Sequence, residues 1–258
     1  MVTRISTLVL LSMAVMVAGC GRGKTEVKLA VGPDAETLAV PDEFGAEAIE
    51  AAGGMDAWAG TKQFDLDCIA SFYQPDGSYY LTEQHYTIYP WSRAAQIRGH
   101  EPGGSYLWQL AMGRFSVKQG ARDMERLTES IAAEDLAQAL LAVTATPALL
   151  LDDRVSFETF GEPVKLEGRW YVKVRRTVRV DALKSYNPPE IVFYHNRRSG
   201  LLDRIWMVRT QGAGFLLVQC HDYQDLGKDS VHVPKRIEIF DTDEQGATLG
   251  RLIKIDLK

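Results

Sequence analysis

The stretch "QFDLDCIASFYQPDGSYYLTEQHYTIY" (residues 63–89) decides the fold, because its period and its turn signal define a β-hairpin. Apolar residues stand at every second position from Phe64 to Phe72, with mostly polar residues between them. That alternation predicts a strand with one apolar face. The "PDG" at 75–77 is a turn signal, and the Tyr- and Thr-rich run after it suits a returning strand. We therefore expect an antiparallel pair here.

Further strands continue this pattern. "RAAQIRG" (93–99) and "SYLWQLAMGRFSV" (105–117) extend the hairpin into an antiparallel meander over residues 62–118. A second group of strand patterns runs from Val155 to the C-terminus and includes "RWYVKVRRTVRV" (169–180). Two rows of side chains are expected to face the interior of the sheet: Tyr106, Trp108, Leu110 and Met112 on one strand, and Trp170, Val172 and Val174 on another.

Helical patterns occupy two separate regions, about 43–59 and 122–146. The first places Phe44, Ala48 and Ile49 on one side and reaches the C-cap signal Gly53-Gly54. The second lacks Gly and Pro, but its apolar stripe shifts near residues 130–133, which indicates two helical pieces or a helix buried on several sides. Strands segregated from helices in this way predict an α+β fold in which the helices cover a large antiparallel sheet.

The N-terminus has the features of an export signal. Arg4 is followed by fourteen apolar or small hydroxyl residues, from Ile5 to Ala18, fewer than the roughly 20 that span a bilayer. "VAGC" (17–20) then resembles the lipobox of bacterial lipoproteins, which implies cleavage after Gly19 and attachment of a lipid to Cys20. We therefore expect three parts: a signal peptide (1–19), a lipidated Cys with a flexible tether (20–41), and a single folded domain (42–258).

Composition narrows the classes of function. A formal net charge of −5 without basic clustering argues against a nucleic-acid-binding surface. The five Trp, ten Tyr and nine Phe are enough for a sizeable core. In an oxidising compartment Cys68 and Cys220 can form one disulfide, or they can remain two buried thiols.

The order of elements and several phrases resemble one known family. "GGMDAW" (53–58), the two meanders with central helices, "SGLLDRI" (199–205), "DYQDL" (222–226) and "VPKRIEI" (233–239) are similar to the LolA/LolB-like lipoprotein-localisation factors. This resemblance covers roughly 43–257. It implies a curved, incomplete β-barrel plugged by helices, whose apolar concave side holds acyl chains. A chain anchored through Cys20 resembles the membrane-bound receptor type.

A half-open apolar cavity can bind an acyl chain without any reacting group, since each buried methylene contributes on the order of 0.8 kcal/mol. The aromatic and aliphatic rows named above are the expected lining. The alternative is that these rows are ordinary core and that the protein is a structural or interaction lipoprotein with a fully packed sheet. The expected partners are therefore the membrane, through the N-terminal lipid, and either an acyl chain or apolar ligand or another envelope protein.

Signals for enzymatic chemistry are weak. The chain contains no G-x-S-x-G, H-E-x-x-H, P-loop or C-x-x-C pattern, and we expect no cofactor and no metal. The five His are dispersed, and Asp65 and Asp67 are expected to share the solvent face of a strand. Arginines at 175, 176, 179, 197 and 198 suit either lipid head groups and partners or a solvated sheet face. Gly21, in place of an Asp after Cys20, favours the outer membrane, facing the periplasm.

Overall fold

The computed structural model describes most of the folded body. The described residues are Leu29, Gly32, 43–101, 104–119, 126–128, 131–178, 190–226 and 231–258. The expected signal peptide, its cleavage at Gly19 and the lipidated Cys20 lie outside these residues, as does nearly all of the expected tether. Within the described residues, no helix is both long enough and apolar enough to cross a membrane.

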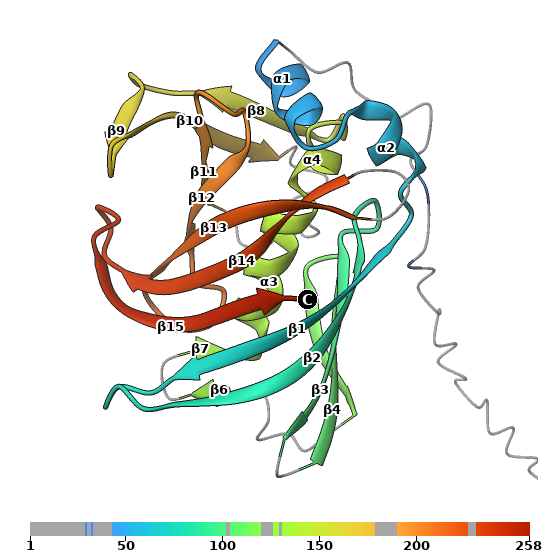
Figure 1. Cartoon of the computed structure of the whole chain (residues 1–258), viewed down its shortest axis with the longest axis vertical. Helices are drawn as coiled ribbons and strands as arrows, with labels where there is room; N and C mark the ends of the chain where they lie inside the picture. The colour runs from blue at the N-terminus through green and yellow to red at the C-terminus, as the bar shows by residue number, and fades with distance from the viewer. Residues whose placement is uncertain are drawn as a thin grey trace, which may run out of the picture.

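Among the described residues, one antiparallel sheet of thirteen strands makes up most of the structure (Figure 1). The strands run β1 Phe64–Tyr73, β2 Tyr79–Tyr89, β3 Ala94–Glu101, β4 Gly104–Ala111, β5 Arg114–Gln119, β8 Val155–Thr159, β9 Val164–Leu166, β10 Arg169–Val178, β11 Ile191–Asn196, β12 Leu202–Val208, β13 Phe215–Leu226, β14 Val231–Thr242 and β15 Thr248–Leu257. Their spatial order is β5-β4-β3-β2-β1-β15-β14-β13-β12-β11-β10-β8, with β9 on β10. The terminal strands β5 and β8 do not pair with each other, so the curved sheet is an incomplete barrel. Both meanders expected from the alternation are confirmed.

The core lies on the concave side of this sheet, where the pleat aligns apolar side chains across strands. One row of directly paired residues crosses seven strands, and each member is 0% exposed: Phe72, Ile253, Ile239, Val218, Ile205, Phe193 and Val174. Because side chains alternate between faces, a shift of one residue in any strand would expose its whole apolar set. This shared register explains why the concave face is continuous.

In the described part of the chain, four helices cover the concave side and one end. They are α1 Glu43–Ala51, α2 Met55–Gly60, α3 Ala133–Thr144 and α4 Thr146–Leu149. Helix α3 lies inside the curve of the sheet, where it contacts β3, β4 and β12, while α1, α2 and α4 lie together at one end (Figure 1). The α+β fold with helices on the concave face is thus as expected.

The boundaries of both expected helical regions need correction. The region 43–59 is two helices, because Gly53 and Gly54 adopt positive φ angles of 115° and 91° that end α1. In the region 122–146 the helix begins only at Ala133. Before it, β6 (Arg126–Thr128) and β7 (Ile131–Ala132) form a short hairpin, at the point where the apolar stripe shifts.

One further expectation is wrong, and of the two alternatives for the cysteines the structure has the buried thiols. Met112 does not face the interior: with Gly113 it forms the two-residue turn between β4 and β5, with φ angles of 49° and 70°, and its side chain is 44% exposed. Cys68 and Cys220 are free thiols rather than a disulfide. β15 and β14 lie between their strands, which separates the two backbones by about 14 Å, twice the reach of a disulfide.

Candidate functional site

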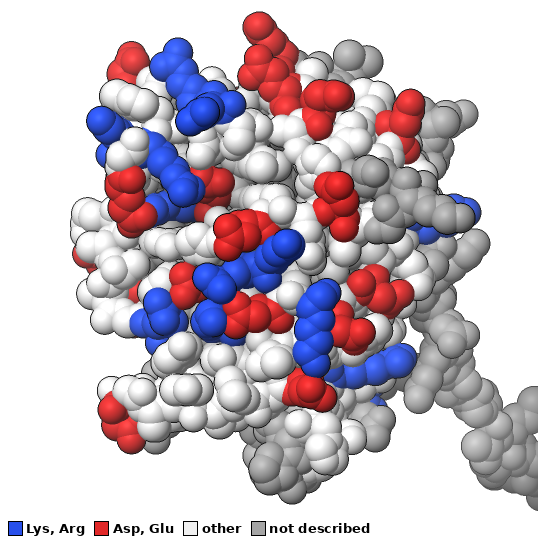
Figure 2. Space-filling view, viewed as in Figure 1, with Lys and Arg blue, Asp and Glu red and all other residues white. Residues whose placement is uncertain are grey.

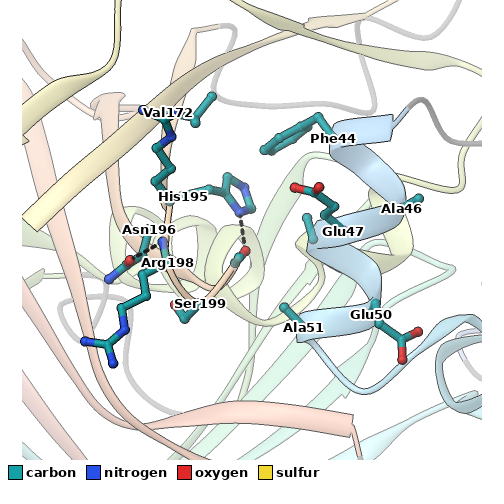
Figure 3. A pocket seen from close by; sticks show the side chains of 13 residues that line it. Phe44, Ala46, Glu47, Glu50, Ala51, Val172, His195, Asn196, Arg198 and Ser199 are labelled. Carbon is teal, nitrogen blue, oxygen red and sulfur yellow. Dashed lines mark hydrogen bonds between the residues drawn. The ribbon is translucent and has the colours of Figure 1, made fainter.

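A cleft of about 780 Å³ separates α1 from the concave side of the sheet near the β11–β12 turn. Its walls are α1, with Phe44, Glu47 and Ala51, and the turn from Asn196 to Gly200 (Figure 3). Val172 and His195 supply its floor. In Figure 3 the ring of Phe44 and the carboxylate of Glu47 point from the helix toward His195, whereas Glu50 points away.

The floor of the cleft belongs to the concave face. Val172 and His195 are paired directly across β10 and β11, and each lies two positions from a member of the buried row, Val174 and Phe193. Side chains two positions apart in a strand share a face. The edge of the Phe44 ring meets the imidazole of His195, with ring centroids 4.9 Å apart. The floor of the cleft therefore lies on the same face of the sheet as the apolar core, and α1 forms the facing wall.

His195 contributes a neutral imidazole to this floor. Nδ1 lies 3.1 Å from the carbonyl oxygen of Gly200, so Nδ1 carries the hydrogen and donates it. Burial lowers the pKa of His195 to about 4, because the charged ring would lose its hydration. At neutral pH the His195 side chain thus adds no charge to the cleft.

Helix α1 is seated against the β11–β12 turn through a glycine. Gly200 has a φ of 72°, and a Cβ atom there would lie 2.9 Å from Cβ of Ala51 and 3.3 Å from the carbonyl oxygen of Glu47. The C-terminal end of α1 is held by β14 and α2. His232 approaches the carbonyl oxygen of Ala51 with Nδ1 and donates its backbone N–H to Ala52, both at 2.8 Å, while Trp58 donates its indole N–H to Ala52 at 2.9 Å.

A second hollow, of about 540 Å³, adjoins the cleft. It is lined by Gly168, Arg169, Trp170, Asn196, Arg197 and Arg198, and the last three of these also line the first cleft. Trp170 is 51% exposed, so its expected place in the interior is wrong. The ladder between β10 and β11 extends only to Tyr171, and Trp170 pairs with Lys165 of the short strand β9.

Three of the other expected lining residues are packed inside the molecule. Tyr106, Trp108 and Leu110 are at most 2% exposed, and the rings of Tyr106 and Trp108 stack with centroids 4.1 Å apart. Tyr106 covers Gly99 on β3, where a Cβ atom would lie 2.2 Å from its ring. Its hydroxyl accepts a hydrogen bond from the side chain of Gln84.

Sequence reasoning missed the residues that shape the cleft as a group, namely Phe44, Glu47, Ala51, His195 and Gly200. Gly200 belongs to the phrase "SGLLDRI", and the Ser-Gly pair in it indicates a turn at this position. Nothing local predicts that the turn meets a helix some 150 residues earlier in the chain.

Asp65 and Asp67 lie on the exposed face of β1, as expected. Asp65 accepts a hydrogen bond from Thr87 at 2.7 Å, and Asp67 lies 2.8 Å from Nδ1 of His85. Within the described part of the chain, no group of three or more His, Cys, Asp or Glu side chains is arranged to hold a metal ion.

Comparisons with known proteins establish the fold. No protein-family model matches the chain, and no curated protein matches it. Among solved structures, a LolA superfamily protein from Nitrosomonas europaea aligns with a TM-score of 0.55 and 12% identity, over 85% of this chain and 92% of that one. A DUF1329 family protein from Desulfovibrio piger aligns with a TM-score of 0.46 and 11% identity, over 85% and 92%. The first of these two alignments shows that the chain has a LolA-like fold.

Proposed function

We propose that this protein is a lipid-anchored binding protein of the bacterial envelope that holds an acyl chain or similar apolar ligand beneath α1. The observation that carries the proposal is the 780 Å³ cleft, which opens onto the concave face of a LolA-like sheet. Ligand sites commonly have about 300–1,000 Å³, and this cleft combines apolar side chains such as Phe44 and Val172 with polar and charged ones from α1 and the β11–β12 turn. A role in lipoprotein or lipid trafficking, with Cys20 as the anchor, agrees with this arrangement.

Binding of an acyl chain in such a cleft requires only that its methylene groups are buried away from water. Phe44, Ala48 and Val172 offer apolar surface, and the neutral ring of His195 does not demand a counter-ion. Each methylene transferred from water contributes about 0.8 kcal/mol, so a chain of about six methylenes gains roughly 5 kcal/mol before ordering costs. Binding of this strength is reversible, as transfer requires.

Helix α1 is the element suited to admit the ligand. Of its residues, Gly45, Ala48 and Ile49 are buried, while Glu43, Ala46, Glu47 and Glu50 are exposed. Its C-terminal end is held by the hydrogen bonds from His232 and Trp58. A rotation about that end would lift Phe44 from His195 and widen the cleft.

The test is native mass spectrometry with lipid extraction on residues 21–258, which include every described residue. We expect a bound species with one or two acyl chains. Val172→Trp should fill the cleft and displace it, whereas Thr177→Trp, at an exposed position of the same strand, should not. A clean apo mass, with no uptake of added fatty acid or lipopeptide, would contradict the proposal.

The second candidate is a protein-interaction role, favoured by an apolar area on the convex face. Tyr79 and Leu81 of β2 are 59% and 58% exposed, and the Tyr79 ring lies 5.4 Å from that of Tyr73. Figure 2 shows few charged side chains over this β1–β2 hairpin, at the lower left. Photo-crosslinking from position 81 in intact cells tests this candidate: a defined protein adduct supports it, and its absence at position 81 counts against it.

A further inference from the structure

The hollow beside the α1 cleft is basic and aromatic. Trp170 is the second residue of β10, and Arg197 and Arg198 lie in the β11–β12 turn beside it, where the backbone N–H of Arg197 donates to the carbonyl oxygen of Trp170 at 2.9 Å. All three side chains are exposed. Lys and Arg side chains gather at the upper left of Figure 2, which is the region of β9 and β10 in Figure 1. This hollow is called the arginine groove below.

Two guanidinium groups in the arginine groove have no counter-ion among the residues that the structure describes. Arg169 lies 3.4 Å from Asp203, so its charge is compensated. Among the described residues, the side chains of Arg197 and Arg198 form no ion pair, and no Asp or Glu lines the groove. Glu47 and Glu50 stand on the opposite wall of the adjoining cleft. An anion is therefore favoured in the groove and disfavoured against α1.

The geometry links this positive site to the apolar cleft. Asn196, Arg197 and Arg198 line both hollows, so a ligand in one is adjacent to the other. Trp170 places an aromatic ring at the junction with solvent, a position that suits the boundary between an apolar chain and a polar head group. Guanidinium groups bind phosphate oxygens through two parallel N–H donors and match their geometry.

We propose that the arginine groove binds the phosphate head group of an amphiphile whose acyl chain occupies the α1 cleft. This inference rests on the proposed function and makes it more specific. It selects an anionic phospholipid-type ligand over an acyl chain that ends in an uncharged group. The phosphate sits at Arg197 and Arg198, Trp170 packs beside the glycerol region, and the chain extends toward Val172 and Phe44.

The test compares three probes on residues 21–258: dioctanoyl phosphatidylglycerol, dioctanoylglycerol with the same chains but no phosphate, and inorganic phosphate. Binding is measured by titration calorimetry below the micelle concentration. We expect the phospholipid to bind at least tenfold more tightly than the diacylglycerol, and inorganic phosphate to bind weakly. Since a hydrogen bond to a charged group contributes about tenfold in affinity, Arg197→Gln with Arg198→Gln should remove this preference by lowering the affinity for the phospholipid to that for the diacylglycerol.

The control is Arg114→Gln with Lys118→Gln, two exposed positions on β5 that change the net charge equally. It should retain the phospholipid preference. Equal binding of phospholipid and diacylglycerol by the unaltered protein would overturn the head-group site and leave the acyl cleft standing. If inorganic phosphate binds as tightly as the phospholipid, the groove is a site for free phosphate, and the proposal that it binds the head group of an amphiphile is wrong. If none of the probes binds, the proposed function fails as well.

Discussion

Replacement of Gly200 by Ala tests whether α1 is seated on the β11–β12 turn. The new Cβ would lie 2.9 Å from Cβ of Ala51, whereas carbon atoms pack at about 3.5–4.0 Å. The helix or the turn must therefore move by about 0.6–1.1 Å. Hydrogen bonds from His232 and Trp58 hold the same end of α1, so the shift strains those contacts too.

The free energy of unfolding that Gly200→Ala is expected to lose has two separable parts, a backbone cost and an overpacking cost. Gly200 has a φ of 72°, and a left-handed conformation costs a non-glycine residue roughly 1–2 kcal/mol. Gly77, in the β1–β2 turn, has a φ of 84° and no atom within 4 Å of a Cβ built there, so Gly77→Ala carries the backbone cost alone. Overpacking adds about 1–3 kcal/mol, so we expect Gly200→Ala to lose about 2–5 kcal/mol and Gly77→Ala about 1–2.

Urea unfolding measures both free energies, and hydrogen exchange locates the change. We expect the amides of residues 43–51 to exchange faster in Gly200→Ala than in Gly77→Ala, and a bound acyl ligand to dissociate faster. Equal destabilisation by the two variants, with unchanged protection of α1, would refute the view that this glycine seats the helix over the cleft.

Three further predictions follow from the buried face and its thiols. Gly99→Ala should lower the free energy of unfolding by about 2–4 kcal/mol, because the new Cβ collides with the ring of Tyr106. Gly250→Ala, on β15 with open space around it, should be nearly neutral, and urea unfolding compares the two variants. The pKa of His195 is lowered to about 4 in the folded state, so the unfolded state takes up the proton first, and the free energy of unfolding should fall as pH drops from about 6.5 to 4. His195→Gln should flatten that part of the stability-pH profile. Burial raises the pKa of the Cys68 thiol to about 12 and raises that of Cys220 further, so neither thiol should react with a thiol reagent at pH 8 until the protein unfolds.

The sheet could be predicted because each strand carries its own evidence. In strands such as β1 the apolar residues recur at every second position, so the period and the apolar face can be read within ten residues. The same rule failed where an alternating run crossed a turn. Met112 continues the spacing of Tyr106, Trp108 and Leu110, but the chain reverses at Met112-Gly113. The Gly after Met112 was the only local sign of that reversal.

The candidate site could not be predicted because it is made by contacts between distant segments. Alternation placed Val172 on the interior face correctly, but it assigned Trp170 to the same environment. What distinguishes the two is the coverage by α1 and β11, which extends over Val172 and ends before Trp170. Likewise, the distance between Cys68 and Cys220 depends on strand order and not on either strand's pattern.

Helices α3 and α1 differ in what their displacement would cost, and under the proposed function this difference favours α1 as the element that opens. Nearly every residue of α3 is buried, and Asp135 at its first turn accepts backbone hydrogen bonds from Thr210 and Gln211 at 2.8 and 3.3 Å. Moving α3 would open the core and break those bonds. Helix α1 buries only Gly45, Ala48 and Ile49 and rests on the β11–β12 turn. Because local openings follow the least buried contacts, ligand exchange should proceed through α1 while α3 remains in place.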